Sequence, residues 1–257
     1  MVTISPLNIG YLNATLAEWY DLPANHPAAS TPDRAAILCF HLATANHSVL
    51  VDAAAYAFPP DFESMVIPGE QRPGLKDQLL ALGIEADDIT DLVITHPHVD
   101  HINGLTKFVD GQHLPLFPKA RHYLGAADWR PETFGSLEQD TLKVIEAWGL
   151  LELVSGKLEL GDGLSIVPMP GETPGHQGLY LNDGEVEVYF TGDLYHHPLE
   201  FSEDINVVWA EPQTMRASKR AIAEQAARSG AKVYFSHIEG AYRAEQTGTQ
   251  LRWLRTE

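Results

Sequence analysis

The sequence predicts a single α/β domain. Short apolar runs that end abruptly in polar residues alternate along the chain with segments whose apolar residues recur near a helical period. The Pro-rich stretches at 56–74 and 168–175 are short and lie between order-promoting residues, so neither is expected to be a linker. At 257 residues the chain suits one large domain, and we expect that domain to span residues 1–257.

The first part of the chain is expected to lack regular structure. Asn13 to Asp33 has little periodicity and contains several prolines. We therefore expect residues 1–34 to form an irregular N-terminal segment that packs on the domain.

The predicted strands are short apolar runs bounded by polar residues. In one of them Val186, Val188 and Phe190 alternate with polar positions, which is typical of a sheet with one solvated face. The predicted strands cover 36–42, 48–51, 92–95, 164–167, 185–191 and 232–236. Between them, helical periods occur at 75–82, at 137–148 and from Met215 to Ala227, with Gly230 placed to end the last helix.

Charge and composition exclude several classes of function. The chain has 17 Lys+Arg against 35 Asp+Glu, a net charge of −18 that would repel nucleic-acid phosphates and anionic lipids. No apolar run approaches the ~18 residues of a membrane helix, and no basic residue precedes Arg34 to begin a secretory signal. The single cysteine, Cys39, is expected to be buried and inert. We expect a cytoplasmic protein with a small-molecule substrate and neither a nucleic-acid nor a membrane partner.

Three histidines and an aspartate follow the predicted strand at 92–95. They form the motif His96-Pro97-His98-Val99-Asp100-His101. A strand end is a rigid support from which side chains can converge, and imidazole with carboxylate suits Zn, Fe, Co, Ni or Mn. The segment therefore predicts a metal site.

Further ligands of the same types follow other predicted strands. His176 comes after Pro174-Gly175, Asp193 after Gly192, and His237 after Ser236. Five histidines and two aspartates suffice for two three-residue sets with one bridging carboxylate, which is the composition of a hydrolytic two-metal site.

The order HxHxDH, PGH, GD and SH, each motif after a strand, resembles the metallo-β-lactamase superfamily over about residues 35–240. The resemblance implies a four-layer αββα sandwich with the metals at one edge of two facing sheets. It implies two divalent metal ions, zinc first, with iron, cobalt or manganese as alternatives, and Asp52 as a residue that orients a ligand histidine. The implied ligands are His96, His98 and His176 for the first ion, Asp100, His101 and His237 for the second, and Asp193 between them.

Differences between this chain and particular branches of the superfamily exclude several of those branches. True β-lactamases of this fold lack the bridging aspartate, glyoxalase II enzymes add a helical domain where only a short tail follows His237, and nuclease branches need a basic face. The remaining candidates resemble the N-acyl-homoserine lactonases and the methyl parathion hydrolases, and because such relatives are often dimers a homodimer is expected. A single-iron redox enzyme and a metal-stabilised binding protein are the competing classes.

We expect hydrolysis of a lactone or carboxylic ester by a metal-bound hydroxide, with N-acyl-homoserine lactone as the leading substrate and an organophosphate triester or aryl ester as the alternative. Asp100 is the candidate acceptor of the water's proton. Lactonases place a tyrosine three residues after the bridging aspartate, where this chain has His196 and the tyrosine is Tyr195. These two residues are the candidate donors to the leaving group.

An apolar wall for the substrate is expected on the Pro-rich stretch that follows Asp52. A loop that leaves this sheet edge can fold over the metals and present large apolar side chains to an acyl chain. The candidate wall residues are Tyr56, Phe58, Phe62 and Met65.

Overall fold

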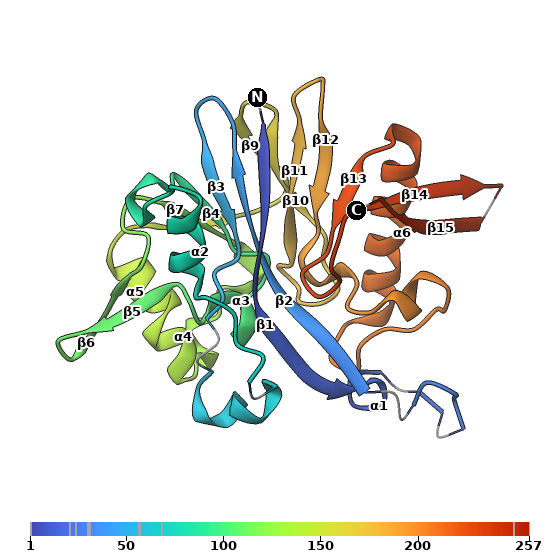
Figure 1. Cartoon of the computed structure of the whole chain (residues 1–257), viewed down its shortest axis with the longest axis horizontal. Coiled ribbons are helices and arrows are strands. Elements are labelled where there is room, and N and C mark those ends of the chain that lie inside the picture. Colours follow the sequence, from blue (N-terminus) through green and yellow to red (C-terminus); the bar gives the residue numbers. More distant parts are fainter. Residues whose placement is uncertain are drawn as a thin grey trace.

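The structure is a computed structural model, and it describes residues 2–20, 22–23, 25–29, 32–55, 58–67, 69–248 and 250–256. Two β-sheets face one another at the centre of the molecule, and helices cover the outer face of each sheet (Figure 1). This arrangement confirms the expected four-layer αββα sandwich. No helix in the described ranges is both long enough and apolar enough to cross a membrane.

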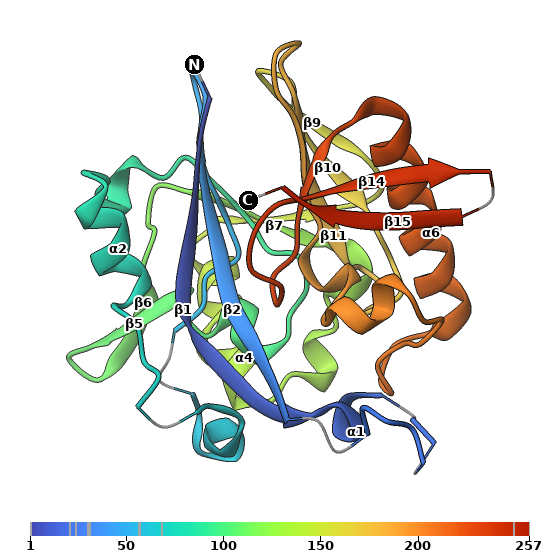
Figure 2. The ribbon, with the colours of Figure 1, turned by 45° about the vertical axis from the view of Figure 1, so that its right-hand side comes forward.

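The first sheet joins an antiparallel ribbon to a parallel block. Within the described residues its strand order is β1 (Thr3–Thr15), β2 (Pro32–Ala43), β3 (Ser48–Val51), β4 (Asp91–Val93), β7 (Arg121–Gly125) and β8 (Leu151–Val154). Strands β1 and β2 are antiparallel and form the long ribbon seen in Figure 2. Strand β3 is antiparallel to β2, whereas β3, β4, β7 and β8 run parallel to one another.

Strand β1 corrects the expectation of an irregular segment over residues 1–34, because it pairs with β2 along its whole length. A bulge between Asn8 and Gly10 shifts the register of this pairing. Ile4 faces the core between the sheets before the bulge, and Tyr11 does so after it. These two residues are an odd number of positions apart, so the bulge removes the uninterrupted alternation by which a strand is recognised.

The second sheet is antiparallel except where β12 and β13 run side by side in the same direction. In the same described ranges its order is β15 (Gln250–Arg255), β14 (Tyr242–Thr247), β13 (Lys232–Tyr234), β12 (Glu187–Phe190), β11 (Gln177–Asn182), β10 (Leu164–Pro168) and β9 (Leu158–Gly161). A separate hairpin pairs β5 (Thr106–Val109) with β6 (Gln112–Pro115).

The core between the sheets is apolar on both sides. Phe40 of β2 and Phe190 of β12 meet there with ring centroids 5.2 Å apart. Strand β12 departs from the expected half-solvated pattern, because Tyr189 on its other face is also buried and shares an apolar cluster with Ile222 of the helix outside. Cys39 is fully buried, as expected, and burial raises the pKa of its thiol to about 12.

Helices and short 3-10 turns complete the outer layers. The longest helix, α6, has an N-terminus capped by the Glu211 side chain, which accepts from the backbone N–H of Thr214 at 2.7 Å. It ends at Gly230, which has a φ of 75° and confirms the predicted stop. The helices are α1 (Leu16–Trp19), α2 (Leu75–Ala81), α3 (Val99–Ile102), α4 (Ser136–Asp140), α5 (Leu142–Ala147) and α6 (Pro212–Ser229). The 3-10 turns are η1 (Pro60–Met65), η2 (Ala86–Asp88), η3 (Ala126–Asp128), η4 (Pro131–Thr133), η5 (Gly192–Leu194) and η6 (Pro198–Phe201).

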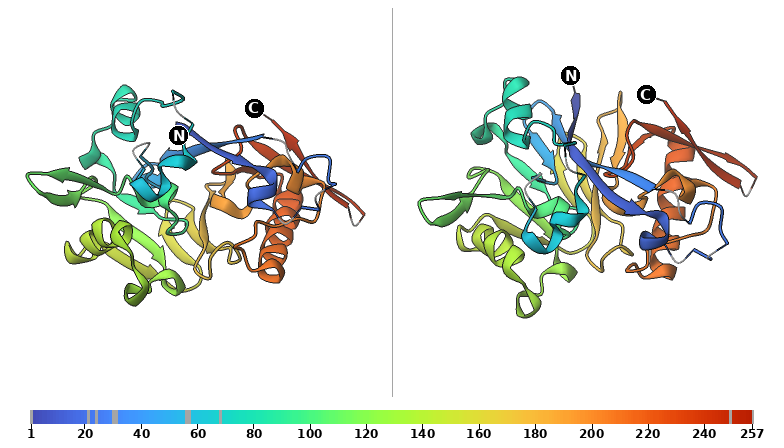
Figure 3. Two further views of the ribbon diagram at one scale, coloured as in Figure 1. Left: turned by 90° about the horizontal axis from the view of Figure 1, so that it is seen from below. Right: turned by 60° about the horizontal axis from the view of Figure 1, so that its bottom comes forward.

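One end of the sandwich collects the polar residues that follow the parallel strands. Strands β3 and β4 end just before Asp52 and His96, and β12 and β13 end just before Asp193 and His237. Because parallel strands end at the same edge of a sheet, these side chains converge between the two sheets. Figure 3 shows the molecule from this end, where α1 (blue) and η1 (cyan) lie.

Candidate metal centre

The HxHxDH motif is held by the transition from strand β4 into the short helix α3. His98 stands immediately before this helix, and Asp100 and His101 lie within it. The Nε2 atom of His96 and the Nδ1 atom of His98 lie 2.9 Å apart. The change from extended to helical backbone thus turns all four side chains of the motif toward the space between the sheets.

Asp193 stands at the middle of the cluster. One of its carboxylate oxygens, Oδ2, lies 3.0 Å from Nε2 of His237, 3.3 Å from Nε2 of His101 and 3.5 Å from Nε2 of His96. The backbone N–H of Asp193 donates to Nε2 of His176 at 3.2 Å. The structure therefore brings together all seven residues that the sequence analysis expects at the metals.

Three of the histidines are oriented by partners outside the cluster. Nδ1 of His101 lies 2.8 Å from Oδ2 of Asp52, the contact that the expected orienting role of that carboxylate requires. Nδ1 of His176 lies 2.8 Å from the carbonyl oxygen of Met169, and Nδ1 of His237 lies 2.7 Å from that of Ala36. An N–H donated outward from Nδ1 leaves Nε2 as a free lone pair that points inward, as a metal ligand requires.

The donor atoms of this cluster fit divalent metal ions. Asp100 Oδ2, His101 Nε2 and Asp193 Oδ1 are buried and have no hydrogen-bond partner among the described residues. Buried polar atoms without partners are costly, and a cation would satisfy all three. Three sets of donors among the described residues have atoms within 4.8 Å of one another and could hold an ion. They are His96, His98, Glu172 and Asp193; Asp100, His101 and His237; and Asp193, His196 and His237.

The electrostatics of the cluster keep its central carboxylate ionised. Burial would raise the pKa of Asp193, but His101, His237 and His96 outweigh burial and hold that pKa well below its usual range. Burial and the neighbouring His101 and His98 lower the pKa of His96 well below its usual value. Burial would lower the pKa of His101 and His237, but Asp193 raises both, so these two imidazoles must release a proton when they bind a metal.

The two candidate proton donors lie on opposite sides of the chain. His196 is buried at the cluster, with Nε2 3.4 Å from Oδ2 of Asp193 and its ring stacked on His237 at 5.5 Å. The prediction for Tyr195 is wrong, because this side chain packs against Phe235 at 5.2 Å and does not line the cavity over the cluster. Successive residues of an extended segment point to opposite sides, so His196 and Tyr195 cannot both face the metals.

Sequence reasoning missed Glu172 and Trp209. Glu172 stands on the loop between β10 and β11, and its Oε1 atom lies 3.2 Å from Nδ1 of His98. The indole N–H of Trp209 donates to the same oxygen at 2.5 Å. Only its position could have indicated Glu172 as a site residue, because it lies four residues before His176 and both residues follow a Pro-Gly pair.

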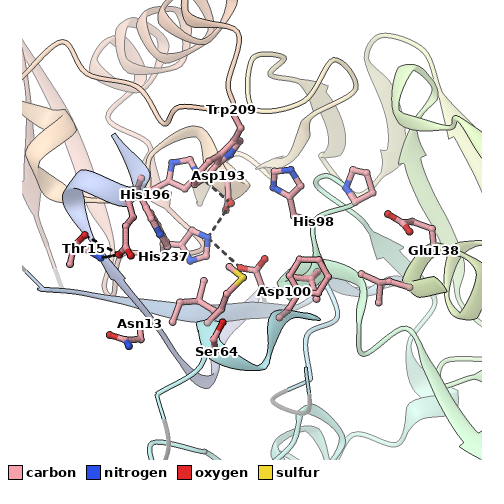
Figure 4. A pocket seen from close by; sticks show the side chains of 18 residues that line it. Asn13, Thr15, Ser64, His98, Asp100, Glu138, Asp193, His196, Trp209 and His237 are labelled. Atoms are coloured by element: carbon pink, nitrogen blue, oxygen red, sulfur yellow. Dashed lines mark hydrogen bonds and ion pairs between the residues drawn. The ribbon is translucent and has the colours of Figure 1, made fainter. Parts of the chain in front are cut away.

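A cavity of about 740 Å³ opens onto the cluster. Its base carries His98, Asp100, Asp193, His196 and His237 (Figure 4). Its walls carry Leu12, Trp19, Phe62, Met65 and Trp209. Phe62 and Met65 confirm part of the expected apolar wall, Phe58 packs on the core instead, and Tyr56 lies outside the described residues.

Comparisons with known proteins agree with this site. Among relatives, the N-acyl homoserine lactonase AiiA of Bacillus thuringiensis subsp. kurstaki is 24% identical over 214 residues, which are 78% of this chain and 80% of that protein. The probable metallo-hydrolase Rv2300c of Mycobacterium tuberculosis is 26% identical over 137 residues, which are 47% of this chain and 41% of that protein.

Two solved structures have the same fold over the whole of this chain. AidC, a dizinc quorum-quenching lactonase in complex with a product, has a TM-score of 0.78 at 19% identity, covering 100% of this chain and 95% of its own. The hydrolase AbOPH has a TM-score of 0.78 at 17% identity, covering 100% and 94% of the two chains. The family model of the metallo-beta-lactamase superfamily matches residues 33–244, from β2 through β14. Because this match spans most of the chain and includes every residue of the cluster, the chain belongs to the metallo-beta-lactamase superfamily.

Proposed function

We propose that this chain, a metal-dependent hydrolase, opens the lactone ring of N-acyl-homoserine lactones at a centre that holds two divalent metal ions. The observation that carries the proposal is the convergence of seven histidine and aspartate side chains, four of which line a cavity that also has large apolar residues in its walls. The lactonase relatives, which match 78% of the chain, support the choice of substrate.

We assign the seven residues to two subsites as the resemblance to the superfamily implies. His96, His98 and His176 belong to the first subsite, Asp100, His101 and His237 to the second, and Asp193, which lies near His96, His101 and His237, to both. When bound, two such ions lower the pKa of water and polarise a carbonyl oxygen. Imidazole and carboxylate donors suit zinc first, with iron, cobalt or manganese as alternatives.

The cavity matches an amphipathic substrate. Its polar base is the place for a lactone ring, whose carbonyl and ring oxygens need polar partners. Trp19, Phe62 and Met65 offer an apolar surface along which an acyl chain can lie. We therefore expect the free energy of binding to become more favourable as the acyl chain lengthens along this wall.

Two side chains at the base are placed to move protons. Asp100 lines the cavity, and its carboxylate is placed to take a proton from the attacking water while it also holds the second metal. A lactone expels an alkoxide, which is too basic to leave unless it is protonated. His196 also lines the cavity, and its Nε2 atom, which has no hydrogen-bond partner among the described residues, is placed to hold that proton.

The test is proton release from N-acyl-homoserine lactones of increasing chain length, with paraoxon run alongside. The protein is loaded with zinc, manganese or cobalt, and metal content is measured in the same samples. Asp193→Ala is the blank, and Asp183→Ala, which removes an exposed carboxylate from the β11–β12 turn, is the matched control.

Lactone opening that persists in Asp183→Ala and is lost in Asp193→Ala supports the proposal. Turnover of paraoxon without lactone opening would replace it with phosphotriester hydrolysis at the same metals. A single iron per chain without hydrolysis of any of these substrates would overturn the hydrolytic assignment.

A further inference from the structure

Glu172 is held rigidly at the edge of the metal centre. The loop that carries it is pressed against helix α6, because a Cβ on the preceding Gly171, which has a φ of 141°, would lie 2.5 Å from Cα of Met215. The carbonyl oxygen of Gly171 also accepts from the backbone N–H of Glu211 at 2.8 Å. The packing of the loop on helix α6 thus fixes the position of Glu172.

The carboxylate of Glu172 is buried and points at the cluster. Its Oε1 atom lies 3.2 Å from Nδ1 of His98 and 3.6 Å from Nε2 of His196, and it accepts from the indole of Trp209. The side chain is fully shielded from solvent, and its Oε2 atom has no hydrogen-bond partner within the described part of the chain. Figure 4 shows these three partners, His98, His196 and Trp209, in the lining of the cavity.

A neighbouring carboxylate shows what Glu172 lacks. Glu200 is equally buried beside His196, but it forms an ion pair with Lys219 and accepts from the hydroxyl of Tyr20 at 2.5 Å. The described residues contain no lysine or arginine within ion-pair distance of Glu172. A buried carboxylate carries a large desolvation cost, and within the described residues only the imidazoles of His98 and His196 are near enough to offset the charge of Glu172. A bound cation would satisfy this charge more fully than imidazoles that also serve the metal centre.

The distances are those of donors that share one ion. Ligand atoms at about 2.1 Å from one zinc lie about 3.0–3.4 Å apart when the angle at the metal is roughly 90–110°. Nε2 of His96 and Nδ1 of His98 are 2.9 Å apart, and Nδ1 of His98 and Oε1 of Glu172 are 3.2 Å apart. We propose that Glu172 is a further metal ligand of the first subsite and gives that subsite a carboxylate of its own, as Asp100 does for the second.

This ligand changes the charge of the centre. Two divalent ions carry four positive charges, of which Asp100 and Asp193 offset two and Glu172 a third. A carboxylate in place of solvent also makes the first subsite a harder ligand set, which favours manganese and iron relative to zinc more than imidazoles alone do. The inference rests on the metal centre of the proposed function, but it is tested by metal binding rather than by turnover.

The experiment is a competition titration of zinc and of manganese against a chromophoric chelator, made on metal-free protein and on three variants. Glu172→Gln keeps the shape of the side chain and removes its charge. Trp209→Phe removes the indole N–H that Glu172 accepts while leaving the carboxylate. Asp91→Asn removes another buried carboxylate that faces a histidine, at the opposite end of the sheet. Thermal unfolding of the metal-free forms establishes that each variant folds.

We expect Glu172→Gln to bind one ion with the affinity of the parent and the other at least tenfold more weakly, with a larger loss for manganese than for zinc. Trp209→Phe and Asp91→Asn should bind both ions as the parent does. Cobalt-loaded protein should show a changed visible spectrum only in Glu172→Gln. Unchanged affinity for both ions in Glu172→Gln would overturn the inference, as would equal losses in Glu172→Gln and Trp209→Phe. Either result leaves the lactonase proposal standing, whereas two bound ions without lactone opening would refute that proposal and leave Glu172 as a ligand.

Discussion

Replacing Asp52 with asparagine is expected to weaken metal binding although Asp52 touches no metal position. Oδ2 of Asp52 lies 2.8 Å from Nδ1 of His101, and Oδ1 accepts from the backbone N–H of Thr95 at 2.7 Å. Asparagine can keep the bond to Thr95, but it then presents an amide N–H₂ to the N–H of His101. The imidazole must rotate or lose its partner, so Nε2 is no longer held toward the second subsite.

The size of the effect follows from the contacts that are lost. One buried donor without a partner costs about 1–3 kcal/mol of folding free energy. Loss of the residue that orients a metal ligand weakens metal binding by about 10–100-fold, which corresponds to about 1.4–2.7 kcal/mol. Backbone strain does not contribute, because Asp52 has a φ of 60° and asparagine tolerates this conformation as well as aspartate does.

The assay is chelator competition for both metal sites, together with chemical unfolding of the metal-free protein. Asp110→Asn is the matched control, since Asp110 has a φ of 50° and lies in the exposed turn of the β5–β6 hairpin. We expect Asp52→Asn to lose affinity at one site and Asp110→Asn to lose none. If Asp52→Asn binds both ions as tightly as the parent, the carboxylate does not orient His101 for metal binding and the reasoning fails.

Three further predictions concern stability. Burial lowers the pKa of His122 to about 4, so as the pH falls below about 6.5 the unfolded chain binds this proton before the folded chain does. The free energy of unfolding should therefore fall by about 2 kcal/mol between pH 7 and pH 5. Urea unfolding of His122→Leu at both pH values should lack this fall. Gly125→Ala would place a Cβ 1.9 Å from a carbonyl oxygen of the loop before β11 and should lower the free energy of unfolding by about 1–3 kcal/mol. In the control Gly74→Ala the nearest contact is 3.6 Å, so the loss should be smaller. Equal unfolding midpoints for the two variants would refute this prediction. Lys219→Met should cost about 3–5 kcal/mol because it leaves Glu200 charged and alone in the interior, and Lys219→Met with Glu200→Gln should recover part of that loss in thermal unfolding.

Much of the metal centre could be predicted because each of its residues follows a recognisable strand. The apolar runs before His96, Asp193 and His237 have the length and polarity of buried strands, and the ends of parallel strands meet at one edge. The histidine and aspartate side chains at these strand ends then limit the site to metal ions that imidazole and carboxylate ligands bind. The layered fold followed from the same motif order, whereas β1 was missed because its bulge breaks the alternation along the strand.

Which side chains face the metals depended on tertiary packing. His196 and Tyr195 are adjacent and equally polar candidates, but a backbone that alternates sides can present only one of them, and the aromatic packing of Tyr195 decides which. Apart from its position near His176, nothing in the sequence indicates Glu172, because its loop reaches the centre only by packing on α6. The sequence by itself determined the kinds of ligand and their place at strand ends, since periodicity and residue chemistry are local. The tertiary structure decided direction, burial and the charges left without a partner, because these depend on contacts between residues far apart in the chain.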